Sequence, residues 1–160
     1  MKTIITTVII FALLIVNLAK PCLGQQSTTA TSTSVGATSV GATYSLTVVI
    51  HNVNTRSGKL YVGLGNSKES FTGQSIQQKT IDVPASGEIT AVFEGLTPGK
   101  YAVRLFQDLN GNQKMDFSGQ MPAEPFGFSN VAMMMGPPDF DQSSFDLTEN
   151  KSIRVRVIEM

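Results

Sequence analysis

Apolar and polar residues alternate along most of the chain from Tyr44 onward. In the segment YSLTVVIHNV, Leu46, Val48 and Ile50 fall on one face, and polar residues occupy most of the other. A period of two suits an extended strand with one face against a core, whereas an amphipathic helix needs a period of about 3.6. No segment outside the N-terminal region carries a helical stripe. The pattern therefore predicts an all-β fold.

Seven segments carry this alternation, and Gly-, Pro-, Ser- and Asn-containing turns separate them. Short strands joined by such turns commonly pack as two antiparallel sheets, face to face. We therefore expect an antiparallel two-sheet sandwich of about seven strands over residues 44–160. The seven segments are YSLTVVIHNV, GKLYVGLGN, QKTIDV, EITAVFEGL, KYAVRLFQD, SSFDLTE and KSIRVRVIEM.

The motif GLTPGKY places Tyr101 directly after a turn, at the start of a strand. In immunoglobulin-like sandwiches, a tyrosine in this setting packs at the corner and its hydroxyl donates a hydrogen bond back to the backbone. We expect Tyr101 to form such a corner, with Leu96 packed beneath it. An ordinary aromatic residue at a strand start is the alternative.

The N-terminus has the order of a secretory signal peptide. Lys2 supplies a positive charge, an unbroken apolar run covers residues 8–16, and Pro21 precedes small residues. We expect cleavage after Gly24, because the apolar run is shorter than the roughly 20 residues of a membrane span. Cys22 as a lipid-bearing cysteine is a weaker alternative, since Lys20 and Pro21 stand where such signals have small residues. Residues 1–24 are thus interpreted as a signal peptide of an exported protein, periplasmic, cell-surface or secreted, with no membrane span after cleavage.

Residues 25–43 (QQSTTATSTSVGATSVGAT) contain mainly Ser, Thr, Ala and Gly, and repeat SVGAT in tandem. Such a composition predicts a flexible linker. The precursor has 12 basic and 12 acidic residues, so loss of Lys2 and Lys20 leaves 10 against 12 and a net charge of −2. No basic patch is visible, which argues against nucleic acid as a partner.

About thirty residues, 109–141, separate the fifth and sixth expected strands. So long a connection in a compact domain usually has a function. It begins in DLNGNQKMD, where oxygen-bearing side chains recur at spacings of two, two and four. Calcium binds six to eight such oxygens. We therefore consider a calcium site formed by Asp108, Asn110, Asn112 and Asp116, with Glu124 or Asp139 adding a carboxylate.

The loop departs from an EF-hand, because its glycine is at the fourth place, its twelfth residue is Gly119, and no helices flank it. The alternative is a tight Asn110-Gly111 turn whose polar side chains bond to the backbone. Both interpretations remain open from the sequence.

Other residues of the connection suggest packing more than chemistry. Phe126 and Phe128 could form a stacking platform, but burial that pins the connection to the sandwich is the favoured interpretation. Clustered methionines fill gaps or contact partners more often than they bind copper. Copper sites usually include histidine as well, and the chain has a single histidine, His51. No nucleophile setting is visible, so we expect no enzymatic activity. The methionines are Met115, Met121, Met133, Met134 and Met135.

Three pieces in fixed order, DLNGNQKMD, EPFGFSN and GPPDF, resemble the bacterial domain of unknown function (DUF) family 2141. The likeness runs from about Tyr44 to Ile158. It implies export and an immunoglobulin-like or prealbumin-like sandwich, but no established activity. Family patterns often have histidine before the first aspartate, where this chain has Gln107. The matching polar positions add three residues, Glu124, Ser129 and Asn130, to the candidate site.

These observations predict an exported, non-catalytic β-sandwich module that presents the long connection, ordered by calcium or by its own hydrogen bonds, to a protein or carbohydrate ligand. One alternative is an extracellular or envelope enzyme that uses Glu124 and neighbouring carboxylates. The other is a structural or adhesion module without metal.

Overall fold

The computed structural model describes residues 41–131 and 136–159. The expected signal peptide and most of the expected linker lie outside the described residues, as do Met133, Met134 and Met135. The described residues belong to one compact unit. Within the two described ranges, no helix has the length and apolar character needed to cross a membrane.

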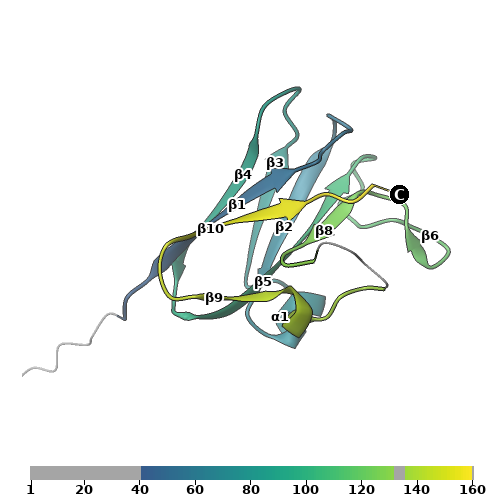
Figure 1. The fold of residues 1–160 in the computed structure, drawn as a ribbon. Helices are drawn as coiled ribbons and strands as arrows, with labels where there is room; N and C mark the ends of the chain where they lie inside the picture. The colour runs from purple at the N-terminus through teal and green to yellow at the C-terminus, as the bar shows by residue number, and fades with distance from the viewer. Residues whose placement is uncertain (1–40, 132–135, 160) are drawn as a thin grey trace, which may run out of the picture. The chain divides into compact units, whose positions relative to one another are not determined.

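A three-stranded sheet has the order β10–β1–β4 (Figure 1). β1 (Tyr44–His51) lies in the middle and pairs antiparallel with β4 (Ile89–Leu96). β10 (Lys151–Arg156) pairs with β1 in parallel. The expectation of a wholly antiparallel sandwich is therefore wrong at this edge.

The parallel pair arises because the last turn carries the chain from one sheet to the other. The strand before the turn, β9 (Ser144–Leu147), pairs with the second sheet, whereas β10 pairs with the first. Asn150 lies in this turn, and its Oδ1 accepts a hydrogen bond from the backbone N–H of Ser45 at 2.9 Å. This contact places the start of β10 beside the start of β1, on the side that β4 leaves open.

The second sheet has five strands and is antiparallel throughout. Its path is β3–β2–β5–β8, and β9 pairs with β5 on the same edge as β8, nearer the start of β5. The four strands of the path are β3 (Gln77–Asp82), β2 (Lys59–Gly65), β5 (Gly99–Asp108) and β8 (Phe126–Phe128).

All seven expected segments contain a strand, namely β1 to β5, β9 and β10. The described residues hold three further short strands, all within the long connection. Two of these, β6 (Phe117–Ser118) and β7 (Met121–Pro122), pair as a small separate hairpin. The third is β8. The domain is thus mostly β and sandwich-like, with ten strands among its described residues where about seven were expected.

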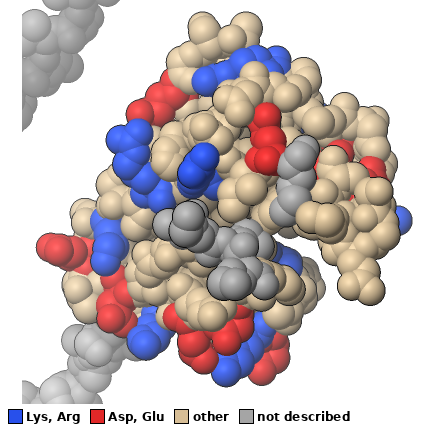
Figure 2. All heavy atoms as spheres, turned by 45° about the vertical axis from the view of Figure 1, so that its right-hand side comes forward, with Lys and Arg blue, Asp and Glu red and all other residues tan. Residues whose placement is uncertain are grey.

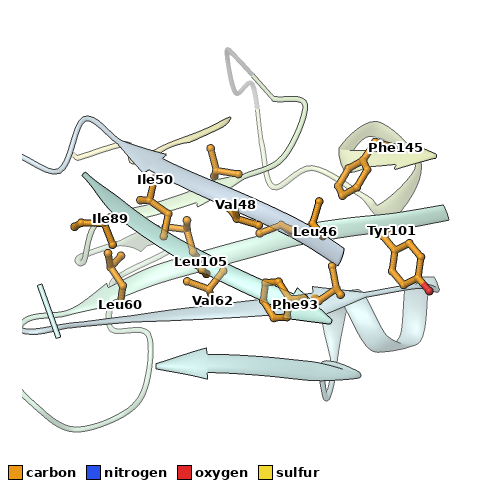
Figure 3. Packing of buried hydrophobic residues seen from close by; sticks show 14 of the residues in the cluster. Leu46, Val48, Ile50, Leu60, Val62, Ile89, Phe93, Tyr101, Leu105 and Phe145 are labelled. Atoms are coloured by element: carbon orange, nitrogen blue, oxygen red, sulfur yellow. The ribbon is translucent and has the colours of Figure 1, made fainter. Parts of the chain in front are cut away.

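The main core lies between the two sheets (Figure 3). Alternate residues of β1, β2, β4 and β5 point inward, and those with apolar side chains are 3 % exposed or less. The period-two expectation for the inward faces is confirmed. The inward side chains are Leu46, Val48, Ile50, Leu60, Val62, Leu64, Ile89, Ala91, Phe93, Tyr101, Val103 and Leu105.

A smaller apolar cluster lies on the other face of the five-stranded sheet, where two short helices cover Ala102. α1 (Lys68–Thr72) contributes Phe71, and α2 (Phe140–Ser143) contributes Phe140. The two rings lie edge to face, with centroids 6.1 Å apart. One end of this outer face is therefore covered.

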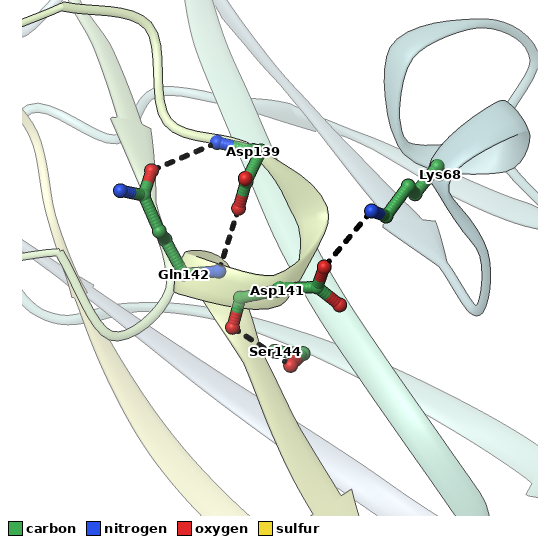
Figure 4. A network of polar contacts seen from close by, with 5 residues as sticks. All are labelled: Lys68, Asp139, Asp141, Gln142 and Ser144. Carbon is green, nitrogen blue, oxygen red and sulfur yellow. Dashed lines mark hydrogen bonds and ion pairs between the residues drawn. The ribbon is translucent and has the colours of Figure 1, made fainter.

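Polar side chains define the ends of these helices (Figure 4). Asp139 caps α2 by accepting a hydrogen bond from the backbone N–H of Gln142 at 2.8 Å, and the Gln142 side chain accepts one from Asp139 N–H at 3.1 Å. Such a capping box satisfies two backbone donors at once. Lys68 of α1 pairs with Asp141 of α2 at 3.0 Å, but both side chains are exposed, so water weakens this ion pair.

The tyrosine corner is confirmed. Tyr101 is 3 % exposed, and its hydroxyl donates a hydrogen bond to the backbone oxygen of Thr97 at 2.8 Å. Leu96, also 3 % exposed, belongs to the same core cluster. The corner therefore fixes the turn between β4 and β5, from which β5 leads into the long connection.

Replacing Tyr101 with Phe removes this hydrogen bond and leaves the ring in place. We expect Tyr101→Phe to lower the free energy of unfolding by about 1 kcal/mol, measured by urea denaturation. Tyr44→Phe, the same chemical change at a half-buried strand start, is the control and should have little effect. Equal stabilities of the Tyr101→Phe variant and the unchanged protein would contradict the assigned role.

Candidate functional site

The long connection starts from a buried carboxylate at the end of β5. Asp108 is 1 % exposed, and its two oxygens accept hydrogen bonds from the backbone N–H groups of Gly111 at 2.7 Å and Gln113 at 2.8 Å. Both of these residues have positive φ, 81° and 64°. This conformation suits glycine but costs energy at Gln113. The bond from Asp108 offsets part of that cost and holds the turn.

Asn110 and Asn112 each form a local turn with their own backbone. The Asn110 Oδ1 accepts a hydrogen bond from Asn112 N–H at 3.0 Å, and the Asn112 Oδ1 accepts one from Lys114 N–H at 2.8 Å. Asparagine commonly bonds to the backbone two residues ahead in this way. Because the oxygens are held, the amide NH₂ groups point elsewhere, and both donate to the carboxylate of Asp116, Asn112 at 2.9 Å and Asn110 at 2.5 Å.

Glu124 joins the two ends of this loop. It is 6 % exposed, and its carboxylate accepts hydrogen bonds from Leu109 N–H at 2.9 Å and Asp116 N–H at 3.2 Å. Bonds from N–H groups to a charged carboxylate are stronger than bonds between neutral groups. Glu124 therefore lies with the four-residue set expected from the sequence, and it holds the start and the end of the loop together.

The other two expected site residues follow β8 and lie away from the loop. Ser129 is 1 % exposed; its Oγ accepts a hydrogen bond from Val103 N–H at 2.8 Å and donates one to Ser143 O at 2.6 Å. The Asn130 side chain donates to Ser144 O at 2.6 Å. Ser129 thus fills the position on the edge of β5 between β8 and β9.

Val103 precedes Asp108 by five residues, about 17 Å along an extended strand. The structure therefore does not bring Ser129 and Asn130 together with the loop carboxylates. Both residues join strands at a separate place in the sheet.

Gln107 occupies the position where the family pattern often has histidine. It is fully buried, and its side-chain NH₂ donates hydrogen bonds to the backbone oxygens of Thr55 and Ser57, both at 2.7 Å. The residue thereby attaches the β1–β2 connection to the end of β5. In this chain the position serves structure.

The geometry bears on the calcium interpretation. The described residues hold no group of three or more His, Cys, Asp or Glu side chains arranged around a common point. Around Asp116 the neighbouring asparagines present amide NH₂ groups, which repel a cation. A calcium ion at this point would require Asn110 and Asn112 to turn and lose their bonds to the backbone.

Three carboxylates of the long connection and its flanks accept hydrogen bonds from backbone N–H groups. Asp139 caps α2, and Asp108 and Glu124 each hold two backbone N–H groups. A pair of catalytic carboxyl groups needs one that donates a proton and one that attacks or activates water at a shared substrate. This arrangement instead directs these acids to the protein's own backbone.

A cleft beside the loop was not expected from the sequence. It has a volume of about 450 Å³ and lies on the outer face of the five-stranded sheet. The face drawn in Figure 2 is hollowed on its right-hand side. Five aromatic side chains line the cleft, Tyr61, Phe106, Phe117, Phe126 and Phe128.

Two of these rings form a cross-strand pair. Tyr61 of β2 lies opposite Phe106 of β5, and their rings stack with centroids 5.1 Å apart at an interplanar angle of 11°. The period-two pattern did hold a signal, because Leu60 and Val62 point inward and Tyr61 must therefore point outward. The pairing with Phe106 was not visible, since the register of β2 on β5 is a tertiary property.

Phe126 and Phe128 hold β8 in place. Phe126 is 2 % exposed, and Phe128 packs on Phe71 of α1 with ring centroids 5.9 Å apart. The interpretation that these rings pin the connection to the sandwich by burial is confirmed. They also line the cleft.

Arg104 brings a positive charge into the cleft. Its guanidinium donates to Thr72 O at 3.0 Å and to Gly73 O, at the end of α1. Neither oxygen carries a full charge. Burial lowers the pKa of Arg104 from its ordinary value, but arginine remains protonated. The ion pairs of the described residues are Lys59–Asp82 and Lys68–Asp141, and neither involves Arg104.

The fold and these sites define a β-rich, sandwich-like domain whose long connection donates backbone hydrogen bonds to two buried carboxylates. The model of an uncharacterized protein family conserved in bacteria, the domain of unknown function (DUF) family 2141, matches residues 48–155. The chain belongs to this family. Comparison with curated proteins and comparison with solved structures each gave no match.

The role of Glu124 leads to a prediction. In Glu124→Gln, one carboxylate oxygen becomes an NH₂ group that faces a backbone N–H, so one hydrogen bond is lost in a buried place. We expect the free energy of unfolding to fall by about 1–3 kcal/mol in urea denaturation. Glu88→Gln is the matched control at an exposed glutamate and should leave stability unchanged. Equal stabilities of the two variants would contradict the assigned role of Glu124.

Proposed function

We propose that this protein is an exported, non-catalytic binding module, and that the β6–β7 hairpin with the loop before it forms its partner-binding surface. Export is supported by the order of charged, apolar and small residues in the first 24 positions. The module then acts in the periplasm, on the cell surface or in the medium. We further assign the sandwich to the immunoglobulin-like or prealbumin-like group, an assignment that the tyrosine corner supports.

One observation carries the proposal: large apolar side chains are exposed on a backbone that is already ordered. Phe117 is 61 % exposed, Met121 58 % and Leu109 41 %, and we call these three residues the hairpin surface. Loops usually lose conformational entropy when they bind. Here Asp108 and Glu124 hold the loop with four bonds to backbone N–H groups before any partner arrives.

The chemistry of the hairpin surface favours a polypeptide partner. Phenylalanine and methionine are enriched in protein interfaces, where methionine adapts its shape to the partner. The face in Figure 2 has basic and acidic residues interspersed, with no broad patch of one sign, which supports a partner other than nucleic acid. A carbohydrate ligand and a purely structural or adhesive role are the other outcomes of the test.

The non-catalytic assignment is supported by the state of the carboxylates. Glu124 is the acid that an enzyme of this connection would use, but it is 6 % exposed and both of its oxygens hold backbone N–H groups. Freeing it for proton transfer would release both ends of the loop.

We propose that hydrogen bonds within the protein order the loop, and that a calcium-ordered loop is the second candidate. The observation that favours calcium is that three acids, Asp108, Asp116 and Glu124, bond to one loop, and none of them forms an ion pair among the described residues. The observation that favours hydrogen bonds is that all three carboxylates already accept N–H donors.

A photo-crosslinker introduced in place of Met121 tests the partner surface in the native cells. Met121 is exposed and does not line the cleft. The control position is Val92, an apolar residue 40 % exposed on β4 in the other sheet. We expect one defined adduct from position 121 that protease degrades, and no such adduct from position 92.

Three outcomes would count against this proposal. A protease-resistant adduct that glycosidases degrade would replace the polypeptide with a carbohydrate. The same adducts from both positions would show that the contact is unspecific. No adduct from position 121 would remove the hairpin surface as the binding site.

A further inference from the structure

The cleft is an uncovered part of an otherwise covered sheet face. At one end of this face, α1 and α2 pack over Ala102. At the other end, residues 113–115 and 117 of the long connection reach over the sheet and contribute to the lining. Between them the stacked rings of Tyr61 and Phe106 remain half-buried. The volume of about 450 Å³ falls within the roughly 300–1,000 Å³ of small-molecule sites.

The charge of the cleft has one sign. Among the described residues that line it, Arg104 and Lys114 are basic and none is acidic. Arg104 uses two of its five N–H donors on the carbonyl oxygens of Thr72 and Gly73. Arg104 is thus a half-buried cation beside aromatic rings, and it has N–H donors that these two oxygens do not use. Such a group suits an anion better than a neutral or positive ligand.

We propose that this cleft binds a small organic anion with a flat apolar body of one or two rings and a carboxylate. The body lies against the rings of Phe117 and the Tyr61–Phe106 pair, and the carboxylate lies toward Arg104 and Lys114. The side chains of Gln78 and Gln113 add hydrogen-bond donors to the lining. Phe117 belongs both to this cleft and to the hairpin surface, whereas Met121 belongs to the hairpin surface and does not line the cleft.

The first test compares two probes of the same size and shape but different charge in calorimetric titrations of the purified protein. Naphthalene-2-acetate carries the carboxylate, and naphthalene-2-acetamide is its neutral counterpart. We expect the acid to bind about tenfold more tightly, because the charge-assisted hydrogen bonds are absent with the amide. Equal affinities, tighter binding of the amide, or no binding of the acid would overturn the proposal.

The second test locates the site with variants that should fold. Phe117 is mostly exposed, so Phe117→Ser removes a lining ring with little effect on the core. We expect it to weaken binding of both probes several-fold, since it removes ring contacts common to both. Val92→Ser, on the other sheet, is the matched control and should leave both affinities unchanged.

The third test concerns charge. Lys114 is exposed and lines the cleft, whereas Lys100 is exposed and does not. We expect Lys114→Gln to weaken naphthalene-2-acetate about threefold and to leave the amide unchanged, and Lys100→Gln to change neither. Binding of the acid that survives both Phe117→Ser and Lys114→Gln would place it outside the cleft and overturn the assignment. This result would leave the crosslinking test at position 121 unaffected.

Discussion

The carboxylate of Glu124 accepts hydrogen bonds from the backbone N–H groups of Leu109 and Asp116, and so fixes both ends of the loop that leaves β5. Together with Asp108, it places two carboxylates in buried positions. A buried charge is costly unless hydrogen bonds compensate for it. Here the donors come from the loop itself, so the loop can be ordered only in a conformation that satisfies these two acids.

The position of the neighbouring elements depends on this loop. The β6–β7 hairpin follows directly after Asp116, so the direction in which Phe117 and Met121 point is set by the bonds of Asp108 and Glu124. Two residues of the loop, Gln113 and Lys114, also line the cleft. Their backbone N–H groups donate hydrogen bonds within the loop. The two proposed binding regions therefore share one source of order and one aromatic ring, that of Phe117.

Much of the fold follows from local pattern. Alternation of apolar residues such as Leu46, Val48 and Ile50 predicted the inward faces, and GLTPGKY predicted the Tyr101 corner. The parallel pairing of β10 with β1 was not predictable, because it depends on which strand edge remains open after β4 has paired. Strands of two or three residues, such as β6 and β8, are too short to show a period.

Only part of the candidate site was predictable from the sequence. The spacing of Asp108, Asn110, Asn112 and Asp116 showed that they would meet, but spacing does not show whether an asparagine presents its oxygen or its nitrogen. Ser129 was misplaced because a single buried serine carries no pattern that shows its bonds to Val103 and Ser143. The cleft requires Tyr61 and Phe106 to lie in register across two strands, which only the folded sheet determines.

Amide hydrogen exchange at the loop tests most directly whether the two carboxylates order it without a metal. The amides of Leu109, Gly111, Gln113 and Asp116 donate to Glu124 and Asp108. Exchange would be followed residue by residue by NMR, in a chelator and in excess calcium. The account predicts that these four amides are protected to the same degree in both solutions. Protection that arises only when calcium is added would contradict it and would make DLNGNQKMD a metal-binding loop.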